Sequence, residues 1–129
     1  MKRNATGLGL LLGASLVLAL AAPAVAKRGD VRVAGTCTKA STAKLKLSEE
    51  DARIEVELEV DQNRNGVRWT VAILQNGSRI ARLTRVTRAP SGSFEARVVA
   101  PNRPGADAFT VRATSRSGET CVARATFSS

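Results

Sequence analysis

Residues 53–74, RIEVELEVDQNRNGVRWTVAIL, decide the fold. The run 53–60 places Ile, Val and Leu on one face and three Glu on the other, and the run 67–74 places Val, Trp, Val and Ile at alternate positions. Alternation with period 2 is the pattern of a β-strand that buries one face. The intervening DQNRNG is typical of a turn, so the stretch predicts a β-hairpin. In this hairpin Glu59 lies opposite Arg68 as a cross-strand ion pair.

The DQNRNG segment also resembles the opening of an EF-hand calcium loop. Asp61, Asn63, Asn65 and Gly66 occupy the first, third, fifth and sixth positions of such a loop. The loop needs a bidentate Glu at its twelfth position, which here is Ala72. We therefore predict a turn rather than a metal site, with Asn63 and Asn65 in left-handed backbone conformations.

The rest of the chain after residue 30 continues the alternation and has no sustained apolar stripe of helical period. Turn residues such as Asn76-Gly77 and Ser117-Gly118 separate the apolar runs. The further predicted strands span residues 31–37, 43–47, 79–87, 93–100, 108–114 and 119–127. Eight short strands at this spacing predict an all-β antiparallel sandwich.

Two connections have distinctive local sequences. Ser48 precedes two Glu and an Asp, a pattern that resembles a helix cap and predicts a single helical turn at 48–51. The segment 101–106 contains two prolines and a glycine with few apolar anchors, and we expect it to be the most mobile connection.

The first 26 residues have the pattern of a secretory signal peptide. Lys2 and Arg3 precede an apolar run over 8–22, which ends before a small-residue cleavage pattern at 24–26. The run is shorter than the roughly 20 residues that span a bilayer. The sequence therefore predicts a secreted, extracellular domain at 27–129 with no membrane span after cleavage.

Cys37 and Cys121 are the only cysteines. In an exported protein an even number of cysteines without metal-type spacing predicts a disulfide. Its loop would enclose almost the whole domain and would stabilise it by roughly 4 to 5 kcal/mol in the chain-entropy model.

The net charge of +9 falls to +7 when Lys2 and Arg3 leave with the signal peptide. A basic balance favours anionic partners such as cell-wall polymers, nucleic acid or acidic lipid surfaces, and it also favours solubility. Nucleic acid is disfavoured because Trp69 alternates with core positions and no exposed aromatic series is available for base stacking.

Four arginines recur every third residue along one predicted strand, at Arg79, Arg82, Arg85 and Arg88. Strict period 2 would bury half of them, so the pattern predicts either a β-bulge or a twisted edge segment in which all four reach water on one flank. Such a series can contact a polyanion, and it can equally protect a sheet edge from aggregation.

The residue types exclude the commonest catalytic arrangements. The chain has no His and no Tyr, which removes the usual general base. Glu55, Glu57 and Glu59 have a spacing that overlaps that of inverting glycosidases, but all i, i+2 acids on a strand share it. Ser41 with Lys44 or Lys46 is formally a serine-lysine pair without a supporting motif. We expect no enzyme activity and no cofactor.

Trp69 and the segment 107–111, DAFTV, carry a resemblance to immunoglobulin and fibronectin type III sandwiches. The chain departs from that pattern at Phe109, which takes the tyrosine-corner position, and at Val111, where antibody domains have a cysteine. Cys37 is also too far before Trp69 for the usual bridge, so the resemblance implies a disulfide between the first and last strands. Over 31–127 the chain is similar to small exported immunoglobulin-like proteins of actinobacteria, a group of uncharacterised function.

From these features we predict a monomeric, non-enzymatic binding or cell-surface module whose extracellular partner is an anionic polymer contacted by the arginine series. Two alternatives stay open. One is a carrier of a small apolar ligand, which requires an apolar cleft. The other is an inhibitor of secreted proteases that presents residues 90–93 or 101–106 as a rigid exposed loop.

Overall fold

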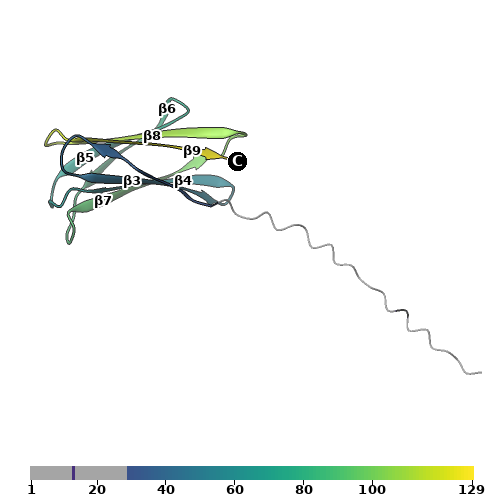
Figure 1. The fold of residues 1–129 in the computed structure, drawn as a ribbon, viewed down its shortest axis with the longest axis horizontal. Coiled ribbons are helices and arrows are strands. Elements are labelled where there is room, and N and C mark those ends of the chain that lie inside the picture. Colours follow the sequence, from purple (N-terminus) through teal and green to yellow (C-terminus); the bar gives the residue numbers. More distant parts are fainter. Residues whose placement is uncertain (1–12, 14–28) are drawn as a thin grey trace, which may run out of the picture.

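The computed structural model describes Gly13 and residues 29–129, so the predicted signal peptide at 1–26 lies, apart from Gly13, outside the described residues. The described chain forms nine strands in two antiparallel sheets that face each other (Figure 1). The predicted all-β sandwich is therefore confirmed, with nine strands in place of eight. Nowhere in the described part is there a helix long and apolar enough to cross a membrane.

The four-stranded sheet has the order β1-β3-β4-β7 and the five-stranded sheet the order β2-β9-β8-β5-β6. In Figure 1, β3, β4 and β7 lie in the lower layer and β6, β8 and β9 in the upper layer. The bounds are β1 (Val31–Ala34), β2 (Thr36–Cys37), β3 (Thr42–Glu50), β4 (Arg53–Asp61), β5 (Arg68–Gln75), β6 (Ser78–Val86), β7 (Ser93–Pro101), β8 (Ala106–Ser115) and β9 (Thr120–Ser128).

The inner faces of both sheets supply the core. Trp69 on β5 is fully buried, and its ring lies 5.6 Å, centroid to centroid, from that of Phe94 on β7 in the opposite sheet. Its Nε1 donates a hydrogen bond to Gln62 Oε1 at 3.0 Å. Phe109 and Val111 on β8 are also buried. The positions that carried the resemblance are thus core positions, and the fold is a small all-β sandwich consistent with an immunoglobulin-like domain.

The predicted hairpin around DQNRNG is wrong, because β4 and β5 belong to different sheets. β4 pairs with β3 and β7, so Glu59 lies opposite Lys44 and Glu95 and not opposite Arg68. The same alternating pattern occurs in two strands that are neighbours in one sheet and in two strands that face each other across a core. Six residues are enough to cross the gap of about 10 Å between stacked sheets.

The predicted helical turn at 48–51 is also wrong. β3 continues through Glu50, and Asp51-Ala52 form a two-residue turn into β4, with Glu50 opposite Arg53. Both turn residues have positive φ, 49° at Asp51 and 60° at Ala52, as a type I′ hairpin turn requires. In antibody domains the inner neighbour of the second strand, B, is the fifth strand, E. In this protein the corresponding position next to β3 is taken by β4, the strand that follows it in sequence.

Replacing Ala52 by Gly should stabilise the protein. A side chain at positive φ costs about 1 to 2 kcal/mol, and the greater unfolded-state freedom of Gly offsets part of that gain. We expect Ala52→Gly to raise the free energy of unfolding by about 0.5 to 1 kcal/mol in urea denaturation. Ala108→Gly, at an exposed site in β8, is the matched control and should lower it by a similar amount. Destabilisation by both changes would contradict the turn assignment.

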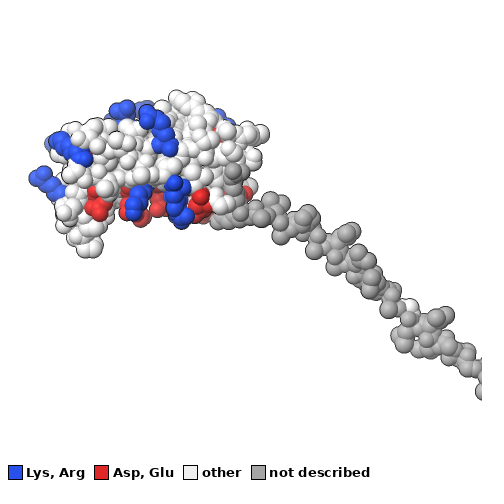
Figure 2. Space-filling view, in the orientation of Figure 1, with Lys and Arg blue, Asp and Glu red and all other residues white. Residues whose placement is uncertain are grey.

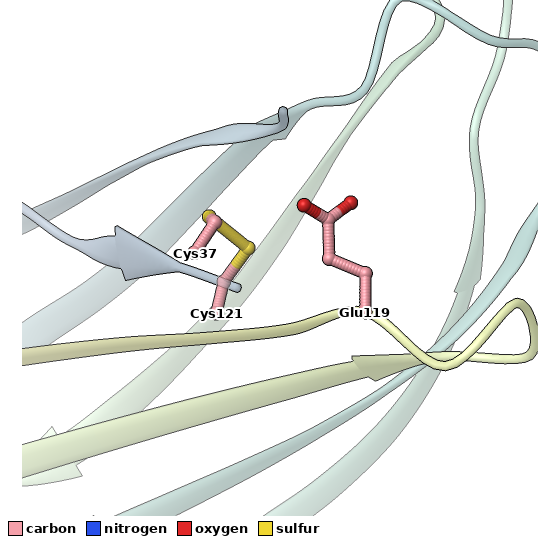
Figure 3. Close-up of side chains that lie close together, drawn as sticks. All are labelled: Cys37, Glu119 and Cys121. Atoms are coloured by element: carbon pink, nitrogen blue, oxygen red, sulfur yellow. A yellow bond between two sulfur atoms is a disulfide. The ribbon is translucent and has the colours of Figure 1, made fainter. Parts of the chain in front are cut away.

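The predicted first strand, 31–37, divides at Gly35 between the two sheets. β1 pairs with β3, and β2 pairs with β9. A Cβ on Gly35 would lie 3.0 Å from both the Ala43 Cβ and the Val122 carbonyl oxygen, so the chain can change sheets here only with a side chain of minimal size. The predicted Cys37–Cys121 disulfide is confirmed and joins β2 to β9 (Figure 3).

Candidate functional site

The arginine series of β6 does not form one row. β6 is the edge strand of the five-stranded sheet, and the predicted bulge is present: Ile73 pairs with Ala81 but Leu74 pairs with Arg79. Arg79 and Arg82 consequently share the outer face. Arg85 shares the inner side of β6 with partly buried residues, and its Nε donates a hydrogen bond to the Glu95 carbonyl of β7 at 3.1 Å.

Arg88 lies beyond the end of β6, where it is exposed and bridges to Ser93. Only half of the predicted series therefore occupies a common surface. The arginines that join Arg79 and Arg82 come from other strands.

The outer face of the five-stranded sheet, with the turn after β8, carries six arginines, and we call it the arginine face. Its arginines are Arg68, Arg79, Arg82, Arg112, Arg116 and Arg124. The outward positions of β5, β6, β8 and β9 include no Asp or Glu, since Asp107 at the start of β8 and Glu119 just before β9 are buried. In Figure 2 acidic side chains gather along the lower border, where basic side chains stand among them, and further basic side chains project from the upper border.

A row of threonines crosses the centre of this face. Thr84, Thr70, Thr114 and Thr120 are successive cross-strand partners on β6, β5, β8 and β9. Adjacent strands are about 4.8 Å apart, so the row presents hydroxyl groups at that interval. The row is the only part of the face where four neighbouring strands carry the same outward residue in register.

Two pairs of arginines flank the threonine row. On one side Arg82 and Arg112 lie in register on either side of Ala72. On the other side lie Arg68 and Arg116, whose backbones are joined by a hydrogen bond of 2.9 Å. Each pair is one side-chain repeat, about 7 Å, from the row. These four arginines with Thr70 and Thr114 line a shallow depression, which we call the arginine cradle.

The depression continues past the cradle toward the loops. Arg68 and Arg116 also line a second hollow with Arg64, and Arg64 lines a third with Lys39. Cationic side chains thus follow one surface from β6 to the end of the sandwich.

None of the cradle arginines makes an ion pair within residues 29–129. The other sheet differs: Arg97 contacts Glu55 at 2.7 Å and Glu50 at 2.9 Å, and Lys46 contacts Glu57 at 3.7 Å. The hydrogen bonds that Arg97 donates to Glu55, first, and to Glu50 raise the pKa of Arg97. Basic groups on the four-stranded sheet therefore have acidic neighbours, and those of the cradle do not.

Asp107 closes one end of the sandwich from inside. It is fully buried, and its Oδ1 accepts hydrogen bonds from Gln75 Nε2 at 2.9 Å and Asn76 Nδ2 at 3.0 Å. Its Oδ2 accepts one from the Arg103 backbone N–H at 3.0 Å. Amide donors thus satisfy this carboxylate without any arginine side chain.

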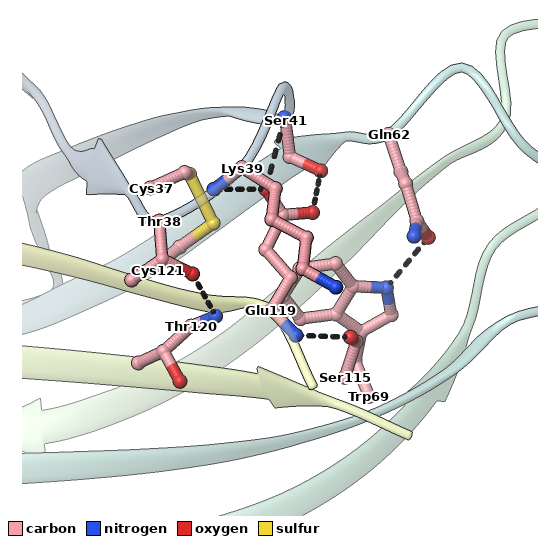
Figure 4. Close-up of a disulfide and its surroundings, with 10 residues drawn as sticks. All are labelled: Cys37, Thr38, Lys39, Ser41, Gln62, Trp69, Ser115, Glu119, Thr120 and Cys121. Atoms are coloured by element: carbon pink, nitrogen blue, oxygen red, sulfur yellow. Dashed lines mark hydrogen bonds between the residues drawn. A yellow bond between two sulfur atoms is a disulfide. The ribbon is translucent and has the colours of Figure 1, made fainter. Parts of the chain in front are cut away.

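Glu119 closes the other end beside the disulfide (Figure 4). Its carboxylate accepts hydrogen bonds from the backbone N–H groups of Lys39 and Ser41, at 3.1 and 3.0 Å, and from the Ser41 hydroxyl. Cys37, Glu119 and Cys121 lie close together, but both sulfur atoms are in the disulfide and cannot act as thiolate ligands (Figure 3). The Ser41 hydroxyl is thereby engaged by an acid and not by Lys44 or Lys46, which lie on the outer face of β3.

The other predicted motifs have structural partners. Asp61 Oδ1 accepts the Asn63 N–H at 3.0 Å, and Asn63 has a φ of 54°. The expected left-handed conformation at Asn65 is wrong, because Gly66 takes it instead, with a φ of 77°. Glu55 and Glu57 bind Arg97 and Lys46, as described above, so two of the three glutamates belong to a charge network on the four-stranded sheet.

The loops and depressions give no distinct support to the two alternative functions. The 88–93 turn is closed by hydrogen bonds between Arg88 and Ser93 and between Arg88 and Gly92. Residues 101–106 bind the sandwich through Arg103 and Asp107. Five surface depressions formed by residues 29–129 open to solvent, and each includes charged side chains.

No protein-family model, curated protein or solved structure matches this chain. The site therefore rests on its own geometry. Sequence reasoning missed Arg68, Arg112, Arg116 and Arg124. The available signal was the R-x-T repeat at 68–70 and again at 112–114, which becomes a common surface only when β5 and β8 pair.

Proposed function

We propose that the protein is a secreted, non-enzymatic module that binds an anionic extracellular polymer through the arginine face. One observation carries the proposal: six arginines occupy a face that has no carboxylate among the described residues. Unpaired guanidinium groups keep their forked donors available for carboxylate, sulfate or phosphate groups. The signal-peptide pattern and the disulfide support export.

The flatness of the face favours an extended ligand over a compact one. The cradle opens to solvent, and its floor consists of Thr70, Ala72 and Thr114 from two adjacent strands. An extended polyanion can contact several arginines at once, so the attraction accumulates although each exposed contact is weak.

The test removes equal charge from two surfaces. The triple variant Arg68→Ser, Arg82→Ser, Arg112→Ser loses three cradle cations, and Lys44→Ser, Arg53→Ser, Arg103→Ser loses three exposed cations elsewhere. We expect the cradle variant to elute from heparin at clearly lower salt. Its slope of log affinity against log salt should fall by about 2, at roughly 0.7 for each lost contact.

The control variant should keep nearly the parental slope, and both variants should keep the parental melting temperature because all six side chains are exposed. The parent protein should also elute later from heparin than from a simple cation exchanger of similar charge density. Equal shifts for the two variants, or coincident elution of the parent from the two media, would show that only bulk charge acts and would overturn the proposal.

A further inference from the structure

We infer that the polymer is a phosphodiester chain with flexible polyol linkers, a poly(alditol phosphate), that lies along the β5–β8 strand pair. This inference rests on the proposed function and names the ligand class of the same face. It depends on three features of the cradle: its donor chemistry, the interval between its rows, and the side chains that it lacks.

The donor chemistry fits tetrahedral oxyanions. Arg82 and Arg112 approach the floor from both sides of Ala72, and the Thr70 and Thr114 hydroxyls lie one row away. Guanidinium forks bind two oxygens in one plane, and hydroxyls add donors from a different direction. A phosphodiester holds two anionic oxygens and two weakly accepting ester oxygens in a tetrahedron around phosphorus, whereas a carboxylate presents its only two oxygens in one plane.

The row interval fits the charge interval of such a polymer. Along β5 and β8 the outward rows are Arg68 with Arg116, Thr70 with Thr114, and Ala72 with Arg112, separated by about 7 Å. Phosphates joined by a three-carbon polyol are six backbone bonds apart, and six bonds of about 1.5 Å span about 7 Å when extended. Successive phosphates can therefore meet successive rows.

The composition of the face disfavours other polyanions. All aromatic side chains of residues 29–129 are buried, with Phe94 the most exposed at 6%, so no platform exists for stacking bases or sugar rings. Of the exposed large apolar residues, Val99 belongs to the other sheet, and Ile80 and Val86 belong to the edge strand, with Val86 in register with Arg68 at the rim of the cradle. A single valine at the rim of a floor made of Thr70, Ala72 and Thr114 is a small apolar surface for anchoring in a lipid bilayer.

The experiment measures the Kd of the oxidised protein for a synthetic glycerol phosphate oligomer of six repeats, by titration calorimetry at 50 and 200 mM salt. Comparison ligands of equal charge are oligogalacturonate, oligo-dT, and vesicles containing phosphatidylglycerol. We expect the glycerol phosphate oligomer to bind at least tenfold more tightly than any of the three.

A charge-neutral variant tests the hydroxyl row. Thr70→Val with Thr114→Val removes two cradle hydroxyls and keeps β-branched side chains on both strands, and it should weaken binding of the glycerol phosphate oligomer about tenfold but leave oligogalacturonate unaffected. Thr110→Val with Thr126→Val, outside the cradle on the same face, should change neither Kd.

The outcomes separate the two proposals. Equal affinity for oligogalacturonate and the glycerol phosphate oligomer would overturn the phosphodiester assignment and leave a general polyanion surface. Tightest binding to oligo-dT or to vesicles would overturn it in favour of nucleic acid or a lipid surface. Failure of all four ligands to bind would overturn the proposed function itself.

Discussion

Replacing both cysteines, Cys37→Ala with Cys121→Ala, is expected to lower the free energy of unfolding by about 4 to 5 kcal/mol. The bridge spans 84 residues of sequence, so its loss returns a large loop-closure entropy to the unfolded chain. It also releases β2, which has only two residues and pairs only with β9. Urea denaturation monitored by Trp69 fluorescence measures the change.

Reduction provides the control for this prediction. Dithiothreitol should destabilise the parent protein by the same amount and should have no effect on the double variant. A loss below about 1 kcal/mol in the variant would show that the unfolded chain gains little freedom, contrary to the loop-closure account.

Replacing Asp107 by Ala is expected to lower the free energy of unfolding by about 2 to 4 kcal/mol. The change removes the acceptor of three N–H groups, those of Gln75, Asn76 and Arg103. The Gln75 donor is buried, and losing its partner costs about 1 to 3 kcal/mol, whereas Asn76 and Arg103 are exposed and can be partly resolvated. The same side chain positions the last turn of the β7–β8 connection. Thermal and urea unfolding should both show the loss.

Asp107→Asn separates hydrogen bonding from volume. Asn has the same shape as Asp and keeps one acceptor oxygen, but its NH2 group would face at least one of the former donors. The stability of Asp107→Asn should therefore lie between the stabilities of the parent and of Asp107→Ala. Indistinguishable stabilities of the parent and Asp107→Ala would mean that water replaces the carboxylate at no cost, and that the carboxylate does not close this end of the sandwich.

Much of the fold could be predicted from side-chain alternation. The burial of Trp69 and Phe109 and the pairing of the two cysteines follow from period 2 and residue counts. The sheet to which a strand belongs does not follow, because alternation defines a buried face but not a neighbour. The segment 61–66 was therefore assigned to a hairpin although it crosses between sheets. The turn at Asp51-Ala52 was missed because neither residue is the Gly that such turns favour.

The candidate site was predicted only in part for a related reason. The sequence predicts Arg79 and Arg82 as surface neighbours because they are close in sequence. A β-bulge, one of the two arrangements predicted for this strand, brings them to one face. Arg68 and Arg112 lie 44 positions apart in the sequence and meet only through the register of β5 with β8. Register depends on the complete sheet, so a surface built across strands is invisible in any single run of residues.

The position of the disulfide also determines how the domain would respond to mechanical load. A force that pulls the segment before β1 away from the segment after β9 passes directly from Cys37 to Cys121 through a covalent bond. Once the end strands have detached, the residues between the two cysteines, which include every arginine of the face except Arg124, carry none of that tension. Under such a load β1 and the part of β9 after Cys121 detach first, and the disulfide then limits further extension of the cradle strands.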